Sequence, residues 1–75
     1  MPHTPTLSEA KKLLGHKIAT IRKKKGYTQE RLAEAIQISH AHLASIEIGR
    51  HAPRLDTLLR IGAELDVQVR DLIAF

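Results

Sequence analysis

The sequence predicts an all-α fold, a compact bundle of five helices, because apolar residues recur at helical spacing between clear start and stop signals. The 75 residues contain one Tyr, one Phe and no Trp, so the core of this single small domain must be aliphatic. Ser or Thr opens three of the helical stretches and glycine closes two of them, as capping residues do.

The first helix is expected over residues 8–25, with Ser8 as its N-cap. Gly26 ends it by supplying a left-handed backbone conformation. The apolar positions that recur at helical spacing along it are Leu7, Leu14, Ile18 and Ile21. Residues 1–7 are expected to form a flexible N-terminal arm, and residues 8–75 the folded domain.

Two short helices joined by a tight turn are expected between Tyr27 and Glu47. Thr28 caps the first of them and Ser39 caps the second, while Gln37 in the turn needs a left-handed backbone. The inward positions are Leu32, Ala33, Ile36, Leu43 and Ile46, with Ile38 packing just before the second helix. This shape is that of a helix-turn-helix, whose second helix can lie in the major groove of duplex DNA.

Two further helices are expected after Gly49, which ends the third, and a loop over residues 50–53. The fourth helix is expected to start near Leu55. The residues expected on its inner face are Leu55, Leu58, Leu59, Gly62 and Leu65. A break at Asp66-Val67 precedes the fifth helix, residues 68–74. The apolar residues of this end exceed what one small core needs, so we expect a dimer surface or a protein-binding surface made by Val67, Val69, Leu72, Ile73 and Phe75.

Charge is distributed unevenly along the chain, whose net charge is +4. Residues 1–54 carry ten lysines and arginines against four acidic residues, whereas residues 55–75 carry two against four. A basic front indicates a polyanionic partner, although a solvated basic surface explains the same charges. The run Lys23–Lys25 complements the C-terminus of the first helix, and contact with phosphate is its alternative role.

Several classes of function are excluded or disfavoured. The chain has no cysteine, so disulfides, thiolate metal sites and cysteine nucleophiles are excluded. No apolar run approaches the roughly 20 residues of a membrane span, and we expect a cytoplasmic protein without a membrane partner. Enzyme signatures such as a glycine-rich phosphate loop or a nucleophile elbow are missing, so we expect neither catalysis nor a cofactor.

Five histidines raise the question of a metal site. His40 and His42 are two residues apart and therefore face different sides of a helix, whereas metal-binding pairs lie three or four apart. His3, His16 and His51 have no acidic or thiol partner at ligand spacing. We expect no metal ion, and we expect histidines near phosphate to make DNA binding depend on pH.

A combined pattern covers residues 10–74. Its segments are Ile21-Arg22, Gly26 to Ala33, Ile38-Ser39, Leu43, Ile46-Glu47, Gly49, Pro53, Leu55 to Leu59, and Val67. The chain resembles the lambda-repressor-like DNA-binding domains of the Cro and xenobiotic-response-element type. The resemblance implies a five-helix fold, DNA binding by the second and third helices, and usually a homodimer.

The resemblance also assigns roles before the third helix. Arg22 and Glu47 are implied to form a structural pair, and a partly buried Arg–carboxylate pair can be bidentate. Gln29 is implied to bond a phosphate and to support a side chain of the third helix, beside the N-cap Thr28.

The third helix is implied to carry the base readout at His40, Ala41 and Ser45, with Ser39 and His42 near the DNA backbone. A histidine ring donates to guanine or accepts from an amino group, depending on its tautomer. The Ala41 methyl can meet the thymine methyl, and the Ser45 hydroxyl can bond either way. None of these is a long bidentate reader, so more discrimination is left to DNA shape.

The chain departs from the family pattern at several positions. Ile48 stands where the family often has Asn. Arg54 and Gln68 stand at N-cap positions where a capping residue is common, so the fourth and fifth helices are expected to be weakly capped. Arg50, with His51 and Arg54, is expected either to contact phosphate or to lie in a solvated loop.

Two functions from different classes remain open. The first is a small dimeric transcriptional regulator, a repressor, that binds double-stranded DNA in a sequence-specific manner; its two recognition helices should then lie roughly 34 Å apart. The second is an antitoxin or adaptor, which uses the same fold to bind a toxin or other protein. A fragment of a longer regulator is a third possibility.

Overall fold

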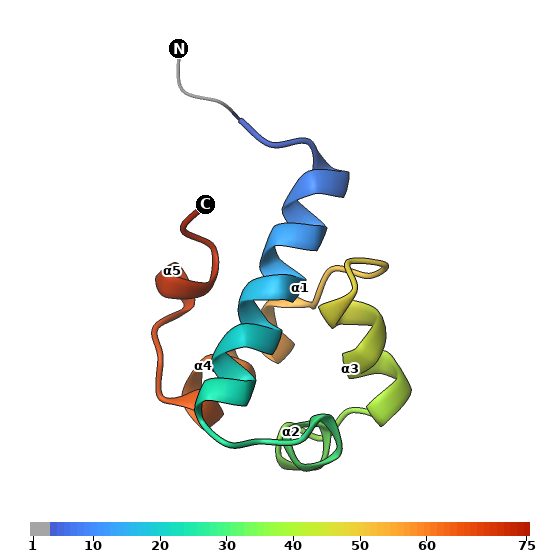
Figure 1. Cartoon of the computed structure of the whole chain (residues 1–75), viewed down its shortest axis with the longest axis vertical. Coiled ribbons are helices and arrows are strands. Elements are labelled where there is room, and N and C mark those ends of the chain that lie inside the picture. Colours follow the sequence, from blue (N-terminus) through green and yellow to red (C-terminus); the bar gives the residue numbers. More distant parts are fainter. Residues whose placement is uncertain (1–3) are drawn as a thin grey trace.

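The structure is a computed structural model that describes residues 4–75. Within these residues the chain forms five helices: α1 (Leu7–Lys24), α2 (Gln29–Ala35), α3 (His40–Glu47), α4 (Leu55–Leu65) and α5 (Val69–Leu72). The long α1 runs through the middle, with α3 on one side, α5 on the other and α2 across its C-terminal end (Figure 1). The predicted all-α, five-helix fold is confirmed.

The core is aliphatic and receives side chains from every helix. Within residues 4–75, the largest of the fully buried side chains are Ile18, Leu32, Ile36, Leu43, Ile46, Ile61, Leu65 and Leu72. Burial of one such side chain contributes about 1.5–3 kcal/mol. All five inward positions predicted for the helix-turn-helix are buried, so the packing of α2 and α3 is confirmed.

The predicted signals around α2 and α3 are also confirmed. The Thr28 hydroxyl accepts from the Arg31 backbone N–H at 3.1 Å, and the Ser39 hydroxyl accepts from the His42 backbone N–H at 3.0 Å. Gln37 has a φ of 62°, as the turn requires. Left-handed glycines follow α1 and α3, with φ of 83° at Gly26 and 82° at Gly49.

The start of α1 differs from the prediction. The N-cap is Thr6 and not Ser8: the Thr6 hydroxyl accepts from the Glu9 N–H at 3.1 Å, and the Glu9 carboxylate accepts from the Thr6 N–H at 2.9 Å. This capping box needs a three-residue spacing, which Thr6 and Glu9 have and Ser8 lacks. Leu7 is therefore helical, and it is 70% exposed rather than inward.

The predicted arm, residues 1–7, is only partly covered by these findings. Residues 1–3 lie outside the described residues, residues 4–6 precede the helix, and residue 7 belongs to α1. The helix also ends one residue earlier than predicted, since Lys25 is its C-cap.

The inward face of α4 is rotated from the one predicted. Leu55 and Leu59 are 70% and 55% exposed, so placing them in the core was wrong. The buried residues are Thr57, Leu58, Ile61, Gly62 and Leu65. A helix buries one stripe of residues spaced three and four apart, and Ile61 completes that stripe whereas Leu55 and Leu59 lie on the adjoining face.

The C-terminal helix α5 is shorter than the predicted 68–74. Leu72 is fully buried and Val67 and Val69 pack against the core, so these three residues serve the fold and are not surplus to it. Ile73 and Phe75 are 48% and 50% exposed and remain available on the surface.

The weak capping predicted for α4 is confirmed, because Arg54 makes no side-chain cap hydrogen bond. At α5 the prediction is incomplete, because the carboxylate of Asp71 at N3 accepts from the Gln68 N–H at 3.2 Å, which is the contact that an N3 side chain makes in a capping box.

Candidate nucleic-acid interface

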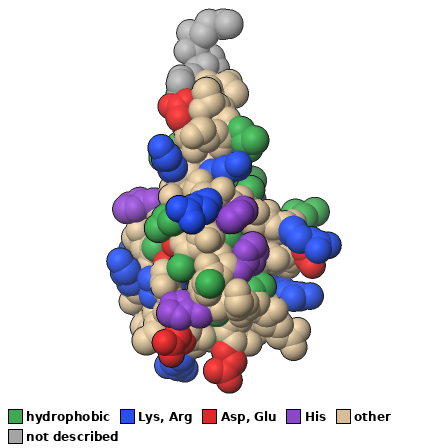
Figure 2. All heavy atoms as spheres, turned by 90° about the vertical axis from the view of Figure 1, so that its right-hand side faces the viewer, with side chains coloured by type: hydrophobic (Ala, Val, Ile, Leu, Met, Phe, Trp, Pro, Cys, Tyr) green, Lys and Arg blue, Asp and Glu red, His purple; other side chains and the backbone are tan. Residues whose placement is uncertain are grey.

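The exposed side of α3 is the candidate interface. His40, Ala41 and His42 are exposed, Ala44 and Ser45 are half-buried, and the remaining α3 side chains belong to the core. Figure 2 shows the face that carries α3, on which histidine, lysine and arginine side chains stand out while acidic side chains lie mostly towards its edges. Such a face favours a polyanion.

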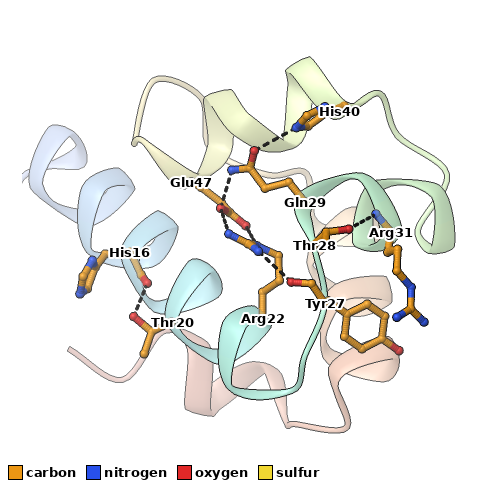
Figure 3. A network of polar contacts seen from close by, with 9 residues as sticks. All are labelled: His16, Thr20, Arg22, Tyr27, Thr28, Gln29, Arg31, His40 and Glu47. Carbon is orange, nitrogen blue, oxygen red and sulfur yellow. Dashed lines mark hydrogen bonds and ion pairs between the residues drawn. The ribbon is translucent and has the colours of Figure 1, made fainter.

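Arg22 and Glu47 form the predicted pair and hold α3 against α1. Arg22 donates from Nε to Glu47 Oε2 at 2.7 Å and from Nη2 to Glu47 Oε1 at 3.0 Å, a bidentate arrangement (Figure 3). The two side chains are only 8% and 4% exposed. Arg22 Nη1 also donates to the Tyr27 carbonyl at 2.8 Å, so the pair also fixes the chain entering α2.

Gln29 extends this network to the start of α3. Its Nε2 donates to Glu47 Oε1 at 2.8 Å, and its Oε1 lies 3.0 Å from His40 Nε2 (Figure 3). The support for an α3 side chain that the resemblance implied is therefore present in the structure. One glutamine at the first turn of α2 is linked to both ends of α3, which sets the orientation of α3 relative to α2.

The close approach of α1 and α3 depends on a residue that sequence reasoning missed. A Cβ on Gly15 would lie 2.2 Å from the Ile46 carbonyl oxygen and 2.7 Å from that of Glu47. Only glycine fits at this distance, because these atoms are backbone and cannot move aside. The signal was a glycine inside a helical pattern, which marks a close backbone approach when it does not end the helix.

An open notch lies between the N-terminus of α2 and α3. It has a volume of about 520 Å³ and is lined by Arg22, Thr28, Gln29, Glu30 and His40. The carboxylate of Glu30 lies 3.8 Å from His40 Nδ1 and is the acidic group in this lining. Thr28 and Gln29, two of the predicted DNA-contacting residues, line this notch at the start of α2. They face His40, the first residue of α3, across it.

The loop after α3 brings further cationic and titratable groups next to this helix. Arg50, His51 and Arg54 are exposed, and the rings of His42 and His51 lie 6.1 Å apart at an angle of 46°. The Arg54 guanidinium is 3.4 Å from the Asp56 carboxylate, so part of its charge is already compensated. The positive charge of Arg50 is therefore more available for binding an anion than that of Arg54.

Sequence reasoning also missed a contact that ties the start of α2 to α4. The Tyr27 hydroxyl donates to Glu64 Oε2 at 2.6 Å, and the Arg31 guanidinium lies 5.3 Å from the centre of the Tyr27 ring. The hydrogen bond to the Glu64 carboxylate raises the pKa of Tyr27 above its usual 10.0. Two residues 37 apart in sequence give no local pattern from which to predict this contact.

Within residues 4–75, no three histidine or acidic side chains are grouped closely enough to hold a metal ion. In the same part of the chain, no helix combines the length and apolarity needed to cross a bilayer.

Comparison with known proteins agrees with this geometry. The model of the helix-turn-helix family HTH_3 matches residues 18–72, which extend from α1 to α5. The chain belongs to the HTH_3 helix-turn-helix family. This family consists of DNA-binding transcription regulators, and α2 and α3 are the helix-turn-helix of this HTH_3 domain.

The immunity repressor protein of Bacillus phage phi105 is 38% identical to the HTH_3 domain over 60 residues, which are 80% of this chain and 42% of the phage protein. The chain thus spans less than half of that relative. Among solved structures, the clp gene regulator ClgR of Corynebacterium glutamicum superposes with a TM-score of 0.84 at 30% identity, over 93% of this chain and 71% of that one.

The biofilm regulator SinR in complex with DNA is also similar, with a TM-score of 0.75 and 37% identity over 79% of this chain and 95% of that one. SinR solved with the SinI protein gives a TM-score of 0.76 at 36% identity, over 80% of this chain and 59% of that one.

Proposed function

We propose that this protein is a sequence-specific transcription regulator, a repressor, that binds double-stranded DNA with α3 in the major groove. The observation that carries the proposal is the network from Arg22 through Glu47 and Gln29 to His40, which fixes the exposed side of α3. The similarity to SinR, solved in complex with DNA, supports the same use of the HTH_3 domain. The proposed role is that of a cytoplasmic protein, and it requires no catalysis and no cofactor.

The proposed contacts divide into two classes. Thr28, Gln29, Ser39, His42 and Arg50 bind the phosphate backbone and fix the register of the domain on DNA. The base edges are read by His40, Ala41 and Ser45, of which Ser45 is half-buried and lies furthest along α3. The phosphate set should control affinity for all sequences, and the base set should control which sequence is preferred.

We further propose that the protein acts as a homodimer, since two-fold dimers on two half-sites are the common arrangement for this motif. The exposed Ile73 and Phe75 at the end of the chain support a contact between copies there. The same surface supports a second function, binding of a protein partner such as a toxin. SinR with SinI shows that a related HTH_3 protein does form a protein complex.

Selection of bound DNA from a random pool tests the proposal. We expect enrichment of one motif, present as two half-sites about 10 base pairs apart. Affinity should fall steeply with salt, by about 10³-fold or more between 50 and 200 mM if six or more phosphates are contacted. Equal binding of random and selected DNA would contradict sequence-specific recognition.

A matched pair of arginine variants locates the interface. Arg50→Ala should weaken binding to every sequence and reduce the salt slope by about one unit, because one phosphate contact is lost. Arg70→Ala removes the same charge from α5, on the opposite side of α1 from α3, and should leave the slope unchanged (Figure 1). Equal effects of the two substitutions would mean that only net charge matters.

A further inference from the structure

The hydrogen bonds that end at His40 have a defined direction. The Glu47 carboxylate can only accept, and its Oε1 accepts from Gln29 Nε2 at 2.8 Å and from Arg22 Nη2 at 3.0 Å. The amide of Gln29 therefore turns its NH₂ towards Glu47 and its carbonyl oxygen towards His40. The reverse orientation would place two acceptors against each other beside a buried ion pair.

This direction determines the tautomer of His40. Its Nε2 lies 3.0 Å from Gln29 Oε1, which can only accept. Nε2 must therefore carry the hydrogen, and in a neutral imidazole Nδ1 is then an acceptor. The side chain is half-exposed, so the ring has one nitrogen engaged by the protein and one at the surface of the notch.

We propose that Gln29 is a positioning residue that fixes this tautomer, so that neutral His40 reads DNA as a hydrogen-bond acceptor through Nδ1. The inference rests on the proposed function, in which α3 enters the major groove. Adenine and cytosine present an amino group there, whereas guanine and thymine present only acceptors as hydrogen-bonding groups. His40 therefore selects adenine or cytosine at the base that it contacts.

Protonation changes this selection. The second hydrogen sits on Nδ1, which becomes a donor, and the acceptors on guanine, thymine and adenine N7 become its partners, whereas cytosine offers no acceptor there. The charged groups facing the ring are the Glu30 carboxylate of α2, 3.8 Å from Nδ1, and the Arg22–Glu47 pair behind Gln29. The Glu30 side chain is 79% exposed and is free to turn away, which leaves Nδ1 to a base.

The other histidines of this face do not share the arrangement. Among the described residues, the ring of His42 makes no hydrogen bond, and its contact is the ring of His51. Protonation of these two rings adds positive charge and raises affinity for all sequences alike. A change in base preference with pH is therefore specific to His40.

The tautomer is tested without DNA by nitrogen-15 NMR of the histidine rings of the full chain. At a pH where the rings are neutral, we expect His40 to show a single tautomer with hydrogen on Nε2, and His42 to serve as the internal reference for a ring without this hydrogen bond. Gln29→Ala should move the His40 signals to the averaged values of that reference. Hydrogen on Nδ1, mixed tautomers in the wild type, or unchanged His40 signals in Q29A would overturn the inference.

The base selection is tested on the selected DNA site with a cytosine–guanine or a uracil–adenine pair at the position nearest His40, since at the contacted base this exchanges an amino group for a carbonyl without adding a methyl group. The ratio of the two affinities should favour cytosine at high pH and shift roughly tenfold towards uracil once His40 is protonated. H40Q provides a matched control, because its amide donates and accepts at every pH, and its ratio should stay constant. The shift should be smaller in Q29A.

The outcomes separate the two proposals. A ratio that does not change with pH in the wild type would overturn the selection by His40 while leaving DNA binding intact. Equal losses for both sites in Q29A, with an unchanged pH profile, would reduce Gln29 to a phosphate contact and overturn its positioning role. If no DNA is bound at any pH, the proposed function fails together with the base selection, whereas the NMR measurement still decides the tautomer.

Discussion

Arg22 and Glu47 place two charges inside an aliphatic core, and every hydrogen-bonding atom around them has a partner. Among the described residues, no buried side-chain nitrogen or oxygen lacks one. The sequence predicted this pair through the family resemblance, which also implied that Gln29 supports a side chain of the third helix but did not indicate that Glu47 is one. The bond from Gln29 to Glu47 depends on where two helices meet, and residue spacing within one helix carries no information about it.

Breaking the pair should be costly because one charge is left buried. We expect Arg22→Leu or Glu47→Leu to lower the free energy of unfolding by about 3–5 kcal/mol, measured by urea denaturation at low temperature with far-ultraviolet circular dichroism. The double variant R22L/E47L should lose less than the sum of the two, because neither charge is stranded. Strict additivity would show that the side chains do not interact.

Tyr27 offers a pH-dependent contact that can be observed directly, because it is the single tyrosine of the chain. Its pKa is raised by the hydrogen bond to the Glu64 carboxylate, so the contact stabilises the fold below the usual tyrosine pKa and is lost as the pH rises through the folded value. Glu64→Gln should lower the pKa of Tyr27 towards 10.0 in a phenolate absorbance titration.

The control for this titration acts in the opposite direction. The positive charge of Arg31 lowers the pKa of Tyr27, so Arg31→Gln should raise it further. A Tyr27 midpoint that is the same in the wild type, E64Q and R31Q would contradict both assignments.

Helices α2 and α3 were predicted with correct caps and inward residues, whereas the starts of α1 and the face of α4 were not. Thr28 and Ser39 each stand between a short turn and the helix that they cap, so few other residues could have been predicted as the N-cap. At α1, Thr6 and Ser8 are both hydroxyl residues close to the start of the helix, and only the capping-box spacing to Glu9 distinguishes them. At α4, leucines occupy two adjoining faces, and packing against the other helices decides which one is buried.

The turn between α2 and α3 carries a local strain that can be removed. Gln37 adopts a φ of 62°, which costs a residue with a side chain about 1–2 kcal/mol relative to glycine. Gln37→Gly should therefore stabilise the domain, by about 0.5–1 kcal/mol after the greater flexibility of the unfolded chain is counted. The melting temperature should rise by about 2–8 °C.

Gly26 supplies the reverse experiment. Its φ is 83° and a Cβ there would meet no atom within 4 Å, so Gly26→Ala changes only the backbone preference. We expect it to lower stability by about 1 kcal/mol. A Q37G variant that melts below the wild type would show that the Gln37 side chain makes a stabilising contact.

On the scale of the whole molecule, the two sides of α1 have different chemistry. The side of α3 carries the exposed histidines and arginines, and the opposite end of the chain leaves Ile73 and Phe75 half-exposed. The division between a basic front and an apolar end could be predicted from the sequence, because charge and apolar residues are segregated along the chain. The sequence could not predict which of the apolar residues remain on the surface, because Val67, Val69 and Leu72 compete for the same core.

The exposed apolar end should hold two copies together. We expect wild-type protein to sediment as a dimer at micromolar concentration, and Ile73→Ser combined with Phe75→Ser to shift it towards monomer, because less apolar area is then buried between the copies. Affinity should fall for DNA with two half-sites and stay unchanged for DNA with one, since only the former uses both copies.

Leu7→Ser is the matched control: Leu7 is 70% exposed at the start of α1, and its replacement should change neither sedimentation nor DNA binding. If the wild type stays monomeric while binding both half-sites, the two copies associate only on the DNA. Ile73 and Phe75 would then be available to bind a protein partner.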